Sequence, residues 1–214
     1  MGEIVFVRHG QANSSATTEE GYDKLSDLGH EQARWLGAWM ADHEQPFDVA
    51  ISGTLRRQRE TLAGMGWDNT DQDARLNEIA YYDLQAEMKE VFGLEQLSPD
   101  DFITHFPKTL QAWKSGEIKG QETWGEFQDR VQEVLAMAQQ PGRRVLCVSS
   151  GGVIAAVVSQ LMDLPIPQMA RIAFPILNTS VHRVLVTEHG PLLAAFNSAP
   201  HLDVADRHYA RTVY

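Results

Sequence analysis

The sequence has few of the features that mark secreted, membrane-spanning or disulfide-stabilised proteins. Cys147 is the single cysteine among 214 residues, so no internal disulfide forms, and its apolar surroundings predict a buried structural thiol. No apolar run approaches the roughly 18 residues that cross a bilayer. Residues 1–7 are apolar but lack the basic leader and the cleavage site of a signal peptide. We therefore expect a cytoplasmic protein without a membrane partner.

Basic residues are also scarce. The chain has 18 Lys and Arg against 29 Asp and Glu, a formal net charge of −11. Nucleic acids and anionic membranes bind basic surfaces, so neither is an expected partner. Net charge acts at long range, however, and a pocket lined by two or three cations still attracts a small anion. The charge therefore leaves a small anionic substrate open.

Three short apolar runs, at residues 4–7, 49–51 and 145–148, each end in a small or polar turn. Continuous runs of this length are typical of strands that are buried on both faces of a parallel sheet. Helical patterns follow the turns, with Ser26 and Thr54 as expected N-caps. This alternation predicts an α/β fold, a three-layer α/β/α sandwich with a mostly parallel central sheet.

Residues 81–120 interrupt the alternation. They combine short helical patterns with two prolines, two glycines between the patterns, and several aromatic residues. Ligands of open α/β sheets bind at the edge where the strands end. We predict that residues 81–120 form a helical insertion over this active edge, within a single domain at residues 1–214. An ordinary helical connection without such a role is the alternative.

Arg8, His9 and Gly10 directly follow the first apolar run, and Arg56 and Arg57 follow another. An imidazole attacks phosphorus and forms a phosphohistidine, which divides one displacement into two easier steps. The transferring phosphoryl group carries negative charge on its oxygens, and the planar guanidinium of arginine binds phosphate through two hydrogen bonds. This pattern indicates phosphoryl transfer with His9 as the nucleophile.

At this point the sequence resembles the histidine phosphatase (phosphoglycerate mutase-like) superfamily over most of its length. The matching motifs, in order, are V-R-H-G-Q at residues 7–11, L-S-D-L-G-H-E-Q-A at 25–33, S-G-T-L-R-R at 52–57 with Thr61, and L-N-E at 76–78. The third motif resembles the family pattern S-S-P-L-x-R-A-x-x-T. In that alignment Arg57, and not Arg56, takes the place of the second phosphate-binding arginine.

The resemblance implies roles for particular residues. His9 is the residue that becomes phosphorylated, and Glu78 protonates the leaving group. The substrate phosphate is expected to contact Arg8, Arg57, Ser150, Gly151 and Gln11. No metal or cofactor is implied, because arginines and helix N-termini supply the positive potential. The sequence also lacks an H-E-x-x-H motif, and one cysteine cannot build a zinc cluster.

The sequence departs from the family at the second active-site histidine, which normally stands in a V-S-H-G-G turn. Here V-S-S-G-G at residues 148–152 places Ser150 in that position. Losing a charge-assisted hydrogen bond costs about 1.5–3 kcal/mol, on the order of 10–100-fold in rate. The Ser150 hydroxyl and the backbone N–H groups of the turn remain as donors. Gly53-Thr54 replaces Ser-Pro, and Ser15 stands where many relatives have asparagine.

His105 and His182 are candidates to replace the missing cation. His201, in contrast, lies in a C-terminal segment that resembles a structural segment of relatives. The expected function is therefore a metal-independent phosphohydrolase whose partner is a small phosphorylated substrate or phosphate.

Three alternatives remain open. One is a catalytically weak or inactive phosphate-binding or regulatory relative, which the replacement at Ser150 favours. Another is a phosphoglycerate-type mutase, although residues 79–121 offer no Arg-rich cluster for a second anionic group. A serine hydrolase is disfavoured because the motif G-x-S-x-G is absent.

Overall fold

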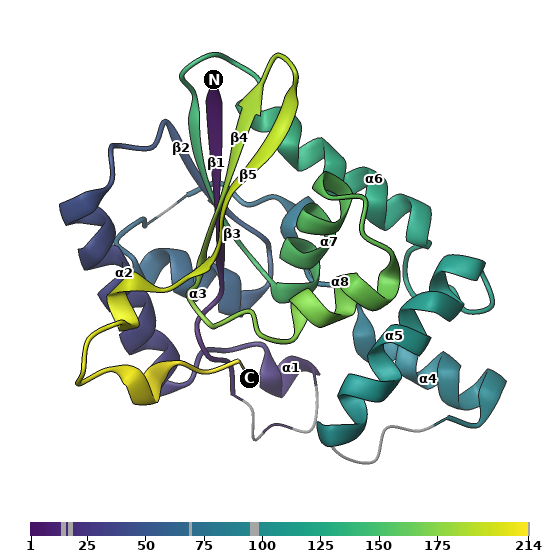
Figure 1. Ribbon diagram of the computed structural model, residues 1–214. Coiled ribbons are helices and arrows are strands. Elements are labelled where there is room, and N and C mark those ends of the chain that lie inside the picture. Colours follow the sequence, from purple (N-terminus) through teal and green to yellow (C-terminus); the bar gives the residue numbers. More distant parts are fainter. Residues whose placement is uncertain (14–15, 17–18, 69, 95–98, 214) are drawn as a thin grey trace.

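The computed structural model describes residues 1–214 except 14–15, 17–18, 69, 95–98 and 214 (Figure 1). A five-stranded sheet with the order β2-β3-β1-β4-β5 forms its centre. The strands are β1 (Gly2–Arg8), β2 (Val49–Ser52), β3 (Arg144–Ser149), β4 (Val181–Thr187) and β5 (Gly190–Ser198). β2, β3 and β1 are parallel to one another, and β4 and β5 are antiparallel neighbours beside β1.

The three parallel strands confirm the prediction that the three apolar runs of the sequence are buried strands. The hairpin of β4 and β5 was not predicted. β4 contains His182 and Arg183, so it lacks a continuous apolar run, and much of β5 is only half-buried. The hairpin places an antiparallel edge on an otherwise parallel sheet, which is a common arrangement in α/β proteins.

Side chains of the central strands alternate between two apolar clusters. Ile4 and Phe6 of β1 point into one cluster, and Val5 and Val7 point into the other, all four at 0% exposure. This alternation follows from the two-residue period of a strand. Burying each such side chain contributes roughly 1.5–3 kcal/mol. A strand that is apolar on both faces can therefore be stable only between two layers.

Helices supply those two layers. α2 (Asp27–His43) and α3 (Arg56–Gly64) cover one face, while α6 (Trp124–Leu135), α7 (Gly151–Leu161) and α8 (Ile166–Ala173) cover the other (Figure 1). The short helix α1 (Glu19–Tyr22) lies at the end of the sheet where β1 ends. The predicted three-layer α/β/α sandwich is thus confirmed.

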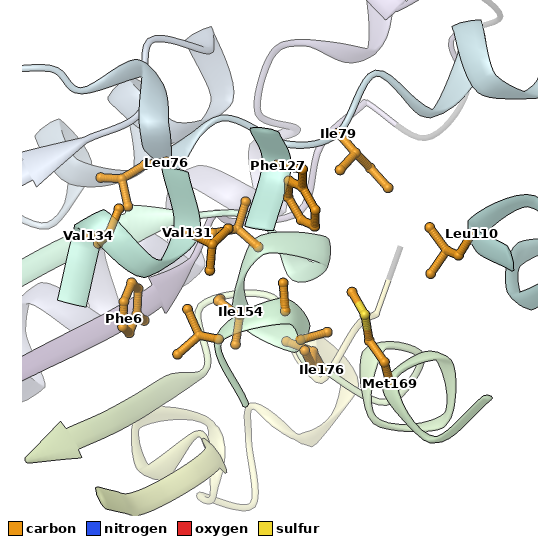
Figure 2. Close-up of a cluster of buried hydrophobic side chains, with 14 of the residues drawn as sticks. Phe6, Leu76, Ile79, Leu110, Phe127, Val131, Val134, Ile154, Met169 and Ile176 are labelled. Atoms are coloured by element: carbon orange, nitrogen blue, oxygen red, sulfur yellow. The ribbon is translucent and has the colours of Figure 1, made fainter. Parts of the chain in front are cut away.

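The predicted insertion consists of α4 (Tyr81–Phe92) and α5 (Pro99–Ser115). Both helices lie beside α8, toward the end of the sheet where β1 ends (Figure 1). Leu110 of α5 belongs to the same buried cluster as Phe6 of the sheet and Phe127 of α6 (Figure 2). The two helices thus share a buried cluster with the sandwich. That residues 1–214 form a single domain stays a prediction.

The two expected N-caps have different outcomes. Ser26 caps α2, since its side chain accepts a hydrogen bond from the backbone N–H of Gly29 at 3.1 Å. Thr54 does not cap α3, which begins after Leu55. The carboxylate of Asp23 instead accepts hydrogen bonds from the backbone N–H groups of Arg56 and Arg57, at 2.9 and 3.1 Å. A distant loop residue therefore satisfies this helix end.

Cys147 is fully buried in β3, and burial raises the pKa of its thiol, so the residue is structural as expected. None of the helices in the described part of the chain is long and apolar enough to cross a membrane.

Candidate active site

The predicted site residues meet where β1 and β3 end. Arg8 pairs with Ser149 at the last position of the β1–β3 ladder, and the backbone N–H of His9 donates to the Ser149 carbonyl at 2.9 Å. Both strands end here: a loop follows β1, and α7 follows β3. His9 and Ser150 consequently occupy adjacent positions on the carboxyl edge of a parallel sheet, where ligands of such sheets bind.

His9 is held as a neutral imidazole with a defined tautomer. Its Nδ1 lies 2.8 Å from the Gly10 carbonyl oxygen, which can only accept a hydrogen bond, so Nδ1 carries the proton. Burial lowers the pKa of His9 well below its usual value, and the charges of Arg57 and Arg8 lower this pKa further. Nε2 therefore has a free lone pair at neutral pH, as a nucleophile requires.

Arg8 is the last residue of β1. Its Nη1 donates to the Ile176 carbonyl. A Cβ placed on Gly151 would lie 3.6 Å from Arg8 Nε. The absence of a side chain at Gly151 therefore leaves the start of α7 open toward this arginine.

Arg57 reaches the site from α3, and its neighbour Arg56 does not. The Arg57 side chain is 3% exposed, whereas that of Arg56 is 57% exposed and pairs with Glu60. Arg57 Nη1 donates to Asp23 Oδ1 at 3.1 Å, and its guanidinium lies 5.1 Å from the ring centroid of Tyr22. Two cationic side chains, Arg8 and Arg57, thus act on His9.

Glu78 lies at the N-terminus of α7. Its Oε2 accepts a hydrogen bond from the backbone N–H of Gly152 at 3.0 Å, and its Oε1 accepts from the N–H of Ile79 at 3.0 Å. A Cβ on Gly152 would overlap with the Glu78 carboxylate. The backbone N–H of Gly152, one of the two donors expected to bind phosphate at this turn, is therefore already bonded to Glu78. The N–H of Gly151 is the other expected donor.

Ser150 and Gln11 are engaged by protein partners. Ser150 is fully buried, and its Oγ accepts a hydrogen bond from Gln58 Nε2 at 2.8 Å. Gln11 Oε1 accepts from the Ser26 hydroxyl at 2.8 Å, and the backbone N–H of Gln11 donates to Gln32 Oε1. Both residues lie beside the turn formed by Arg8, His9 and Gly10 (the RHG turn), and these hydrogen bonds hold their side chains in place.

The two histidines considered as replacement cations are not equivalent. Burial, with a smaller effect of Arg8, lowers the pKa of His182 to about 3, so this residue is neutral and cannot supply the missing charge. Its ring lies between the Ser180 hydroxyl and the backbone N–H of Asn197, at 2.9 and 3.2 Å. His105 lies on α5 in the insertion. Ser15 lies outside the described residues.

His201 has the structural role expected for it. Its Nε2 lies 2.8 Å from the Thr179 hydroxyl, which itself donates to the Asn178 carbonyl, so His201 is the donor of this pair. Burial lowers the pKa of His201 to about 3, with Arg207 contributing. The ring supports the turn whose Thr179 N–H donates to the Arg8 carbonyl at 3.0 Å.

Three residues near the site were missed from the sequence: Asp23, Gln58 and Asn178. Asn178 Nδ2 donates to the His9 carbonyl at 3.1 Å, and Asn178 Oδ1 accepts from the Thr212 hydroxyl. Asp23 and Asn178 come from loops, and Gln58 adjoins Arg57 without a motif that marks it. A β-strand prediction for residues 181–187 would have placed Asn178 beside β1.

One large cavity lies away from the candidate site. This cavity of about 750 Å³ between α6, α7 and α8 is lined by residues such as Gln128, Ser159 and Met169, and by none of the predicted site residues. In the candidate site His9 and Arg57 are each 2% exposed, whereas Arg8, Gln11, Glu78 and Gly151 are partly exposed. Among the described residues, no group of three His, Cys, Asp or Glu side chains is placed to hold a metal.

Known proteins resemble this chain in sequence. A glucosyl-3-phosphoglycerate phosphatase from Mycolicibacterium vanbaalenii is 31% identical over 182 aligned positions, and the alignment covers 76% of this chain and 75% of that protein. A 2,3-bisphosphoglycerate-dependent phosphoglycerate mutase from Methylorubrum extorquens is 32% identical over 96 aligned positions, and this alignment covers 41% of this chain and less than half, 45%, of the mutase.

Solved structures show the same fold. A mutant phosphoserine phosphatase from Entamoeba histolytica, solved with phosphoserine, has a TM-score of 0.67 at 20% identity and covers 94% of this chain and 100% of that one. The family model described as histidine phosphatase superfamily (branch 1) matches residues 4–199. The chain therefore belongs to the histidine phosphatase superfamily.

Proposed function

We propose that this protein is a phosphohydrolase that acts on a phosphate monoester through a phosphohistidine at His9, without a metal. The observation that carries the proposal is the state of His9: a neutral imidazole whose Nδ1 proton is bound by the Gly10 carbonyl, beside Arg8 and Arg57. A neutral ring with a free Nε2 next to two cations is equipped to attack an anionic phosphoryl group.

In the first step, Nε2 of His9 attacks phosphorus and the bond from phosphorus to the leaving oxygen breaks. Glu78 gives its proton to that oxygen, so an alcohol leaves and the phosphoryl group stays on His9. Arg8 and Arg57 hold the phosphoryl oxygens, where their charges offset the negative charge of the transition state. Gly151 allows the group to approach the N-terminus of α7.

In the second step, water attacks phosphorus and the P–N bond breaks. The Glu78 carboxylate takes the proton of the water, so Glu78 returns to its acid form and His9 returns to the neutral ring. Inorganic phosphate leaves. Gln11 and Ser150 complete the surroundings of the phosphate in this proposal, Gln11 through its place next to the RHG turn and Ser150 through its hydroxyl.

The phosphatase assignment follows a relative that matches 76% of this chain, the glucosyl-3-phosphoglycerate phosphatase. The shorter match to the phosphoglycerate mutase supports mutase chemistry as a second candidate, since a mutase forms the same phosphohistidine and returns the group to substrate. A cytoplasmic location, and a small phosphorylated partner in place of nucleic acid or membrane, stay predictions.

A phosphate-binding protein without turnover is the third candidate. It is favoured by Ser150, which is neutral and already bonded to Gln58. Binding requires only that phosphate reach Arg8 and Arg57. Turnover requires in addition that His9 reacts.

The experiment compares wild type with His9→Ala, and uses His189→Ala, whose side chain is 88% exposed, as the matched control. Release of phosphate from p-nitrophenyl phosphate is measured with chelator present, and the protein is denatured in alkali to trap any N-linked phosphate. We expect turnover and an alkali-stable, acid-labile phosphoryl label in wild type and His189→Ala, and neither in His9→Ala.

The alternatives have distinct results. Interconversion of phosphoglycerate isomers faster than phosphate release would establish a mutase. A folded wild type that releases no more phosphate than His9→Ala, while phosphate raises its Tm, would replace the phosphatase proposal by the binding protein. Turnover that the chelator abolishes would contradict the metal-independent mechanism.

A further inference from the structure

Three residues that depart from the family pattern lie in contact behind the candidate site. Ser150 stands at the histidine position of V-S-H-G-G, Gln58 at the alanine of S-S-P-L-x-R-A-x-x-T, and Gly53 at the second serine of that pattern. Gln58 Nε2 donates to Ser150 Oγ at 2.8 Å, and a Cβ on Gly53 would overlap with Gln58 Oε1. The three departures are therefore one local arrangement.

The orientation of the Gln58 amide is determined by its neighbours. Gln58 Nε2 also donates to the Leu76 carbonyl at 3.0 Å, and a carbonyl can only accept, so Nε2 and not Oε1 must face this side. Both Nε2 hydrogens are then in use, one on Leu76 and one on Ser150. Gln58 Oε1 is buried against Gly53 and has no hydrogen-bond partner among the residues that the structure describes.

This orientation decides what Ser150 can do. A hydroxyl that accepts a hydrogen bond from an amide keeps its own hydrogen for another acceptor. The described residues include no acceptor for the Ser150 hydroxyl hydrogen, although Ser150 and Gln58 are both 0% exposed. The Ser150 oxygen thus accepts a hydrogen bond from Gln58, and its buried hydroxyl can still donate one hydrogen bond.

Ser150 lies within the site sequence and not at its margin. The carbonyl of the preceding Ser149 accepts from the backbone N–H of His9, and a Cβ on the following Gly151 would lie 3.6 Å from Arg8 Nε. Gln58 follows Arg57 directly on α3. Through the bond to Ser150, Gln58 links the helix that carries Arg57 to the turn that faces His9.

Resting on the proposed function, we propose that Gln58 is a positioning residue that orients Ser150 as the neutral hydrogen-bond donor to the phosphoryl group, in place of a second histidine. Gly53 leaves the room that the Gln58 amide occupies. A histidine at residue 150 that kept the side-chain direction of Ser150 would point its ring at the Gln58 amide, whose Nε2 lies 2.8 Å from Ser150 Oγ.

The test is a double-mutant cycle of Gln58→Met, which keeps the length of the side chain and removes the donor, and Ser150→Ala. Each variant is assayed for kcat and KM well below its own Tm. We expect each single change to lower kcat/KM roughly tenfold, and the double variant to be no worse than either, because both changes act through the Ser150 hydroxyl. Independent, multiplying effects, or a lower Tm with unchanged kcat/KM in Gln58→Met, would reduce Gln58 to a structural residue.

A second measurement does not depend on Gln58→Met being folded. Ser150→His is made alone and together with Gln58→Ala. We expect the single variant to lose stability and activity, and the pair to recover both. Full activity and an unchanged Tm for Ser150→His alone would overturn the proposal.

Failure of the proposed function is distinguishable from failure of this inference. If wild type binds inorganic phosphate but releases none from ester substrates, the phosphatase proposal fails, and the cycle is read from the Kd of inorganic phosphate by calorimetry. Equal, non-additive weakening in Gln58→Met and Ser150→Ala still supports the role of Gln58. Unchanged phosphate affinity in both variants contradicts it.

Discussion

Asp23 Oδ1 accepts hydrogen bonds from both the backbone N–H and the guanidinium Nη1 of Arg57, each at 3.1 Å. One carboxylate thus satisfies the start of α3 and neutralises an arginine proposed to bind phosphate. An incoming phosphoryl group is negatively charged like Asp23, so the two compete for the same cation. The strength of phosphate binding is therefore expected to depend on this loop residue.

Asp23→Asn removes the charge and keeps an oxygen that can cap the helix. We expect the inhibition constant of inorganic phosphate to fall by roughly 3- to 10-fold, because Arg57 is no longer neutralised, with a loss of about 0.5–1 kcal/mol in unfolding free energy. Competitive inhibition assays and denaturant titrations measure the two effects. Asp42→Asn, on the exposed C-terminal turn of α2, makes the same change in net charge far from the site. Weaker phosphate binding in Asp23→Asn would mean that Asp23 orients Arg57 for the substrate.

Gly152→Ala tests the position of Glu78. The added Cβ would overlap with the Glu78 carboxylate, which is the end of a flexible side chain and can move away. We expect kcat to fall at least tenfold while the protein remains folded, because the proton donor is displaced. The matched control is Gly125→Ala in α6, where the nearest atom to the new Cβ is 3.9 Å away. Unchanged kcat in Gly152→Ala would remove Glu78 from the mechanism.

The pH dependence of kcat/KM reports on His9. Burial, Arg57 and Arg8 lower the pKa of His9, so the ring stays neutral and nucleophilic below the pH near 6.5 at which a free histidine is half protonated. We expect the acid limb of the profile to lie below pH 6.5, measured in buffers of constant ionic strength. A limb at or above pH 6.5 that belongs to His9 would contradict the neutral ring described above.

The pH dependence of stability reports on His182 and His201. Each has a folded pKa of about 3 against roughly 6.5 in the unfolded chain, so acid protonates the unfolded state first. Their contribution to stability is complete above pH 6.5 and is lost as the pH falls below it, at about 1.4 kcal/mol per pH unit for each residue. Unfolding free energies between pH 8 and pH 5 measure this slope.

His201→Gln separates one histidine from the other acid-sensitive groups. Glutamine can still donate to the Thr179 hydroxyl and does not titrate, so the stability of this variant should fall less steeply with acid, by about one proton. His189→Gln, at an exposed position, should retain the slope of wild type. Identical slopes in all three proteins would show that His201 is already protonated in the fold.

Much of the site could be predicted because its residues directly follow buried strands. A short run that is apolar at every position must lie between two layers, and the residues after it must emerge at a sheet edge. Arg8 ends β1 and His9 follows it, and Ser150 follows β3, so their meeting depends only on the pairing of these strands. Arg57 required the family pattern as well, since Arg56 satisfies the charge argument equally.

What the sequence by itself determined is therefore the sandwich and the sheet edge that carries His9, the proposed nucleophile, because apolar periodicity and strand ends are local properties of the chain. The tertiary structure decided what each polar group bonds to. Asp23 reaches Arg57 across 34 residues, Gln58 reaches Ser150 across 92, and Asn178 reaches His9 across 169. Such hydrogen bonds depend on distances of about 3 Å between loops and helix ends, which only the packing of the whole chain establishes.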